Sequence, residues 1–103
     1  MRQTLFQNAA QTILLDCSLY QSFVLTFTTS VETMLLKKVV PGMLYAFALR
    51  QNSKGSHRMN WGTAARNGVA IDPLPESVTV QCFLGMAGGY LQAIPPGSWN
   101  ETV

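Results

Sequence analysis

The stretch richest in chemically reactive side chains runs from Leu49 to Trp61 and reads LRQNSKGSHRMNW. It holds the only histidine of the chain, His57, and three of its seven cationic side chains, Arg50, Lys54 and Arg58. Histidine is the usual general base near neutral pH, and clustered cations suit an anionic substrate. The stretch therefore has two alternative interpretations: a catalytic or anion-binding loop, and a simple turn between two strands.

The remaining residues favour the turn. A catalytic base needs a nucleophile and an orienting group. None of the five carboxylates falls in a motif with the histidine: Asp16, Glu32, Asp72, Glu76 and Glu101. Lys54-Gly55 lies between two alternating segments, as in a β-hairpin, and the side chains of Gln51 and Asn52 can hydrogen-bond the turn. Trp61 is expected to reach the core. We therefore expect no catalytic residue and no enzyme.

The composition indicates that the partners of this chain are proteins. Charged residues make up 12% of the 103 residues, whereas about 25% is usual. Such a surface is largely neutral and partly apolar, which is typical of contact with other proteins. The net charge of +2 is too small to indicate nucleic acid or an anionic membrane as a partner. No apolar window approaches the roughly 20 residues of a membrane span, and the start of the chain does not resemble a signal peptide.

The two cysteines, Cys17 and Cys82, lack the spacing of a metal site, so we expect neither a metal nor a cofactor. They are either two separate thiols or a disulfide between neighbouring strands, and the sequence leaves both alternatives open.

The dominant period of the sequence is two, which is typical of β-strands. In SFVLTFT, for example, Phe23, Leu25 and Phe27 fall on one face. Turn residues such as Pro41-Gly42 separate the alternating segments. We expect strands near 11–16, 21–28, 33–38, 43–51, 57–61, 69–72, 78–84 and 89–94. The pattern predicts a single antiparallel β-sandwich or jelly-roll-like domain over 11–94, with an N-terminal arm at 1–10 and a C-terminal tail at 95–103.

The two ends supply the candidate partner-binding residues. Leu5 and Phe6 stand in an otherwise polar stretch, which is either a frayed terminus or extra edge strand, or an arm that contacts a neighbouring subunit. Trp99 either packs on its own domain or anchors a partner, because tryptophan is enriched among interface anchors.

The ordered set of strands and turns resembles the small β-sandwich domain of tailed-bacteriophage structural proteins, especially of tail fibres and spikes. The first part of the match is a turn, a strand that ends in Gln-Asn, a glycine turn and a tryptophan. These positions are Pro41, Gly42, Leu49, Gln51, Asn52, Gly55, Trp61 and Gly62. The second part is a final hairpin that sets Val78, Val80 and Phe83 against Tyr90 and Leu91 across Gly88-Gly89.

The resemblance implies a virion structural protein that is assembled in the host cytoplasm. A chain of this length looks more like a capsid decoration (cement) protein than a fibre. Its expected partners are the major capsid protein or other virion proteins, and its expected form is a homotrimer without nucleic-acid or membrane contacts. The alternative is a tail fibre, spike or baseplate-associated module that contacts other tail proteins or a host-surface glycan.

Overall fold

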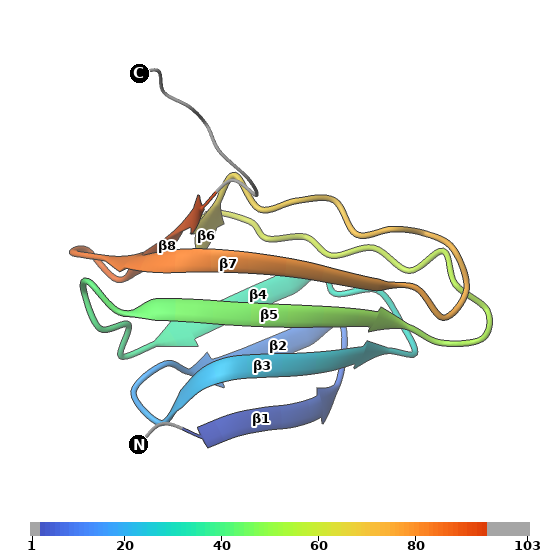
Figure 1. Cartoon of the computed structure of the whole chain (residues 1–103), viewed down its shortest axis with the longest axis horizontal. Helices are drawn as coiled ribbons and strands as arrows, with labels where there is room; N and C mark the ends of the chain where they lie inside the picture. Colours follow the sequence, from blue (N-terminus) through green and yellow to red (C-terminus); the bar gives the residue numbers. More distant parts are fainter. Residues whose placement is uncertain (1–2, 95–103) are drawn as a thin grey trace.

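The alternating segments of the sequence form two packed β-sheets in the computed structural model, which describes residues 3–94 (Figure 1). These residues contain no helix. The eight strands are β1 Gln3–Asn8, β2 Thr12–Asp16, β3 Tyr20–Phe27, β4 Thr33–Lys37, β5 Leu44–Gln51, β6 Ala65–Arg66, β7 Val78–Met86 and β8 Tyr90–Ile94. The all-β class is therefore confirmed.

One sheet has six strands in the order β1-β3-β5-β7-β8-β6, and the other consists of β2 and β4. Four of the six strand pairings are parallel, namely β1–β3, β3–β5, β2–β4 and β6–β8. Only β5–β7 and β7–β8 are antiparallel. The expectation of antiparallel pairing throughout is thus wrong.

The parallel pairing follows from the path of the chain. From β1 to β5, successive strands alternate between the two layers, so each strand returns to its own layer running in the same direction (Figure 1). The chain winds in this way as a right-handed coil, the hand preferred by connections between parallel strands. Within residues 3–94, only the segment from β7 to β8 doubles back as a hairpin.

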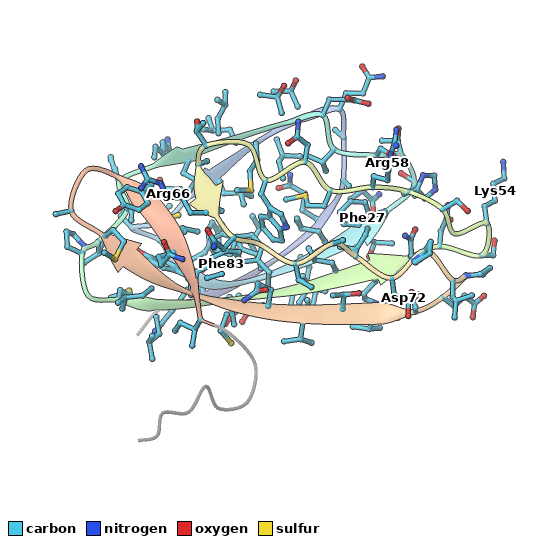
Figure 2. The ribbon with its side chains drawn as sticks, turned by 90° about the horizontal axis from the view of Figure 1, so that it is seen from above. Phe27, Lys54, Arg58, Arg66, Asp72 and Phe83 are labelled. Carbon is cyan, nitrogen blue, oxygen red and sulfur yellow. The ribbon has the colours of Figure 1, made fainter. Side chains whose placement is uncertain are left out.

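Both sheets contribute to one hydrophobic core. The inward row of β3 contains Phe23, whose ring lies 4.8 Å from that of Phe47 on β5. Phe47 in turn lies 5.3 Å from Phe83 on β7, and Trp61 stacks edge-on against both. Figure 2 shows Phe27 and Phe83 pointing into the space between the layers. The second layer closes the core with buried residues that include Ile13, Leu15 and Met34.

The segment Leu49 to Trp61 does not form the hairpin that the sequence predicts. β5 ends at Gln51 and is already flanked by β3 and β7, so the sheet has no place beside it for a hairpin partner. The chain instead crosses to the other layer, where Met59 makes an isolated parallel bridge to Val31. The strand expected at 57–61 is reduced to this bridge.

Two further expectations about strands are corrected. Residues 69–72 form no strand, and a short strand that the sequence did not indicate, β6, lies just before them. The final hairpin exists, but within β7 only residues 82–86 pair with β8. Val78 and Val80 extend beyond it and pair with Arg50 and Ala48 of β5 instead.

Candidate interaction surface

The six-stranded sheet has an apolar outer face. On β7, the inward positions are held by Thr79, Gln81, Phe83 and Gly85, so the other residues of the strand point away from the core. These outward residues are Val78, Val80, Cys82, Leu84 and Met86. Val80 is 66% exposed and Val78 54% exposed, which is unusual for the middle of a sheet whose outer face meets water.

The neighbouring strands continue this face. The register places Phe6, Val24, Ala48 and Val80 in one row across β1, β3, β5 and β7. Leu44 of β5 is 55% exposed and lies in another row, opposite Leu84. We call this surface the outer apolar face and define it by the outward residues of β3, β5 and β7 together with Phe6 and Ile94.

Charge is nearly absent from the outer apolar face. Arg50 is the one charged side chain among the outward residues of β3, β5 and β7, and it lies at the end of β5. A second cation, Arg66 on the edge strand β6, stacks on Tyr90 with its guanidinium carbon 4.2 Å from the ring centroid. A partner that covers the face therefore meets mainly hydrocarbon, with little charge to desolvate.

A groove of about 400 Å³ crosses the outer apolar face. Its walls include Leu44 and Ala46 of β5, Cys82 of β7 and Ile94 of β8. The small side chains of Ala46 and Cys82 leave the hollow, and the larger ones of Leu44 and Ile94 border it. An apolar side chain of a binding partner is the occupant that such a lining suits.

The two cysteines are free and lie in different environments. Cys82 is exposed on the outer apolar face, whereas Cys17 is buried in the core. Burial raises the pKa of the Cys17 thiol to about 11, and the neighbouring carboxylate of Asp16 adds to the effect. The disulfide alternative is therefore wrong, because one thiol faces the interior and the other faces out.

The loop that contains the histidine is held by structural hydrogen bonds. The amide of Gln51, which is buried, accepts a hydrogen bond from the backbone N–H of His57 and donates to the carbonyls of His57 and Asp72. The Asn52 side chain accepts from the N–H groups of Lys54 and Gly55. The predicted roles of Gln51 and Asn52 in the turn are thus confirmed, and Trp61 is buried as expected.

His57 lines a small groove together with Met59, Ile71 and Pro73, and its Nε2 is buried without a hydrogen-bond partner among residues 3–94. The cations of the same loop, Lys54 and Arg58, are exposed (Figure 2). Within the described part of the chain, no group of three or more histidine, cysteine or carboxylate side chains is placed to hold a metal ion.

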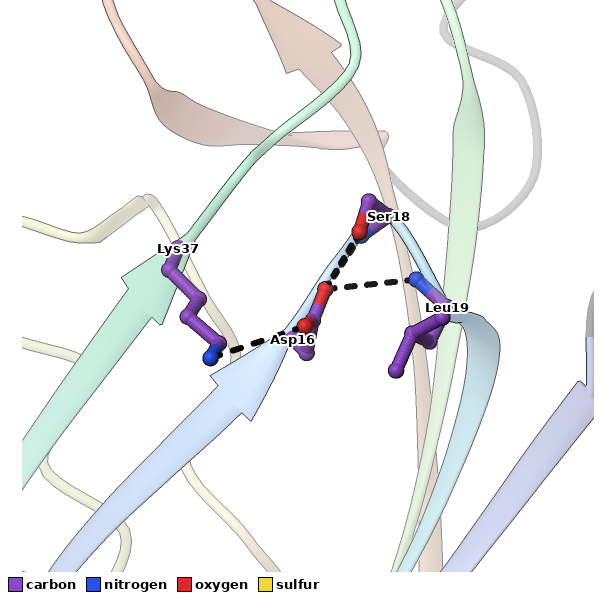
Figure 3. A network of polar contacts seen from close by, with 4 residues as sticks. All are labelled: Asp16, Ser18, Leu19 and Lys37. Carbon is purple, nitrogen blue, oxygen red and sulfur yellow. Dashed lines mark hydrogen bonds and ion pairs between the residues drawn. The ribbon is translucent and has the colours of Figure 1, made fainter.

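One carboxylate, Asp16, organises the turn from β2 to β3 (Figure 3). It accepts hydrogen bonds from the hydroxyl and backbone N–H of Ser18, at 2.6 and 2.9 Å, and from the N–H of Leu19. The ammonium group of Lys37 lies 3.6 Å away. The hydrogen bond from the Ser18 hydroxyl is the main reason why the pKa of Asp16 is lowered. This carboxylate therefore has a structural role.

The candidate partner-binding residues of the N-terminal stretch lie in β1, so the edge-strand alternative holds for residues 3–8. Leu5 is half-buried and packs against the core. Phe6 points outward and is 74% exposed. Trp99, the third candidate, lies outside the described residues.

Sequence reasoning missed the outer apolar face as a site. Alternation in β7 gives no signal for this face, because the apolar set of Val78, Val80, Cys82 and Leu84 is typical of a core face, whereas the inward set contains Thr79 and Gln81. No known protein family, curated protein or solved structure matches this chain. Among the described residues, no helix is long and apolar enough to cross a bilayer.

Proposed function

We propose that this protein is a structural subunit of a larger protein assembly and that it binds its neighbours through the outer apolar face. The observation that carries the proposal is the row of exposed, uncharged side chains on β5 and β7, with Leu44, Val78 and Val80 each more than half exposed. A contiguous face of this kind is typical of a protein interaction site. The role is non-catalytic.

The size of the face supports the proposal. Five strands about 4.8 Å apart and about seven residues long cover roughly 550 Å². Covering such a surface contributes at most about 14 kcal/mol at 25 cal/mol per Å², before the costs of association are subtracted. Those costs are of similar size, so one isolated copy binds weakly, whereas copies that are joined to one another bind a regular lattice firmly.

The assembly that we propose is the virion of a tailed bacteriophage, with the protein as a decoration subunit on the outer shell and the major capsid protein as its partner. This step rests on the resemblance of residues 11–94 to small β-sandwich modules of virion proteins. Two packed sheets with a common core are compatible with such a module. The alternative is a position on the tail, and immunogold labelling distinguishes the two locations.

The test is the thermal stability of shells with and without bound protein. Saturating binding is expected to raise the melting temperature of the shell measured by calorimetry, and Val80→Lys is expected to abolish that rise. Leu74→Lys is the matched control, because Leu74 is 64% exposed, close to the 66% of Val80, but lies in the loop before β7. An unchanged melting temperature on saturated shells contradicts the decoration role.

Immunogold labelling of intact particles gives the location. Label over the whole shell supports the decoration role, whereas label confined to the tail assigns the protein to the tail instead.

A further inference from the structure

The strand β1 forms an open edge of the six-stranded sheet. It pairs with β3 on one side, and no described strand pairs with its other side, as Figure 1 shows at the lower end of the sheet. An open edge presents unpaired N–H and C=O groups that can bind another strand.

The hydrogen bonds show which groups face this edge. Just beyond β1, the N–H of Ala9 donates to the carbonyl of Thr26 on the β3 side. Because the N–H and C=O of alternate residues in a strand point to the same side, Leu5 and Gln7 also face β3. The N–H and C=O of Thr4, Phe6 and Asn8 therefore point away from the sheet.

Nothing in β1 protects this edge. Natural sheets block edges with charged residues, prolines, bulges or very short strands. The strand QTLFQN carries neither charge nor proline, and its register shift lies between Gln3 and Thr4, which leaves 4–8 regular. The opposite edge of the sheet is β6, which is two residues long and carries Arg66.

This contrast between the edges favours a closed pair of copies. A head-to-tail assembly would need a long strand at both edges, whereas the sheet offers one only at β1. A head-to-head pair uses the same edge twice and closes after two copies. Because β1 has no charge, the pairing brings no like charges together.

We propose that two copies of the chain pair their β1 strands antiparallel about a two-fold axis perpendicular to the sheet. The register follows from the three residues whose backbone N–H and C=O groups face the open edge, Thr4, Phe6 and Asn8. Only one register uses all three, with Phe6 opposite Phe6 of the second copy and Thr4 opposite Asn8 of the second copy. Each residue then gives and receives one bond, so this register forms about six backbone hydrogen bonds.

The pairing accounts for the 74% exposure of Phe6, because the two phenylalanines meet beside the axis. It joins the two sheets into one continuous sheet of twelve strands, counted as twice the six of each copy. The axis is perpendicular to the sheet, so both outer apolar faces look the same way. A dimer, in place of the homotrimer that the resemblance implies, then binds an assembly through two faces at once. This consequence rests on the proposed function, whereas the dimer itself does not.

The first test measures the mass of the protein in solution by sedimentation equilibrium. The unmodified chain is expected to sediment as a dimer, and Phe6→Lys to lower the association constant at least about tenfold, because two ammonium groups meet at the axis. Val80→Lys is the matched control: Val80 lies in the same row of the same face, 66% exposed, but three strands from the edge. It is expected to leave the dimer unchanged.

The second test fixes the register with disulfides in a Cys82→Ser background. Opposite residues of a hydrogen-bonded pair have Cα atoms about 5.5 Å apart, within the range that a disulfide spans. Phe6→Cys is therefore expected to cross-link two copies on mild oxidation. Leu5→Cys is not, because two copies of residue 5 stand diagonally across the axis, about 8 Å apart.

A chain that stays monomeric at every concentration, or a dimer that tolerates Phe6→Lys and fails to cross-link at residue 6, overturns the proposal. A trimer overturns it as well. Shell stabilisation that survives Val80→Lys contradicts the role of the outer apolar face and leaves the dimer untouched. A chain that does not dimerise contradicts the pairing of β1 and leaves the outer apolar face untouched, so the two proposals fail separately.

Discussion

Tyr45→Phe tests how much the hydrogen bonds of one buried hydroxyl stabilise the packing of the β2–β4 sheet on the six-stranded sheet. Tyr45 is 1% exposed, and its hydroxyl donates a hydrogen bond of 2.7 Å to the carbonyl of Cys17, just beyond β2. The same hydroxyl accepts a bond of 3.1 Å from the N–H of Val40. The substitution removes one oxygen atom and keeps the aromatic ring, so the change in stability reports these bonds rather than a cavity.

The magnitude follows from the burial of the two partners. The Cys17 carbonyl lies at a buried residue, and leaving such a group unsatisfied costs about 1 to 3 kcal/mol. Val40 is half-buried, so water partly replaces the lost bond there and the cost is about 0.5 to 1 kcal/mol. We expect a loss of about 1.5 to 4 kcal/mol in the free energy of unfolding. At about 5 °C per kcal/mol, that lowers the melting temperature by about 8 to 20 °C.

Urea unfolding followed by tryptophan fluorescence measures the loss, because Trp61 is buried in the core. Tyr20→Phe is the matched control: Tyr20 is half-buried at the start of β3, and we expect its loss to stay under about 0.5 kcal/mol. If Tyr45→Phe costs no more than Tyr20→Phe, the hydroxyl does not fasten the layers and the reasoning is wrong.

Three further predictions concern the turns and the thiols. Gly55→Ala is expected to destabilise the fold by about 2 kcal/mol or more, and Gly42→Ala by about 1 kcal/mol, in thermal melts. Both glycines have positive φ, but an added Cβ at Gly55 would lie 2.6 Å from the Pro73 carbonyl, whereas at Gly42 it meets nothing within 4 Å. Iodoacetamide is expected to alkylate Cys82 in the folded protein and Cys17 only after unfolding, as peptide mapping will show. Folding raises the pKa of the Cys17 thiol from an ordinary value of 9.0 to about 11. Between pH 9 and 11 the unfolded chain loses this proton and the folded chain keeps it, so the contribution of the thiol to the free energy of unfolding is full below pH 9 and is lost by pH 11. The free energy of unfolding from melts across this pH range should fall by about 2 to 3 kcal/mol, and Cys17→Ala should not show that fall.

The interaction surface shows why alternation alone is an incomplete guide. In β7 the hydrophobic set of Val78, Val80, Cys82 and Leu84 would be assigned to the core on hydropathy, yet it points outward. The buried set includes Gln81, whose amide accepts a hydrogen bond from the N–H of Val69 and donates to the carbonyls of Cys82 and Ile94. A polar side chain with this many partners is stable inside, and only the folded chain supplies them.

The sequence by itself determined the all-β class, the approximate bounds of most strands and the turn at Asn52, because these depend on neighbours within a few residues. It also indicated the burial of Trp61 from the residue type, although the rings that bury it, Phe47 and Phe83, lie far away in the chain. Tertiary structure alone decided that β1, β3 and β5 run parallel, that residues 52–60 cross between layers, and that β1 ends the sheet with Phe6 exposed. A period of two fixes which residues share a face, but the face that meets the core and the strand that lies alongside depend on contacts between residues far apart in the chain.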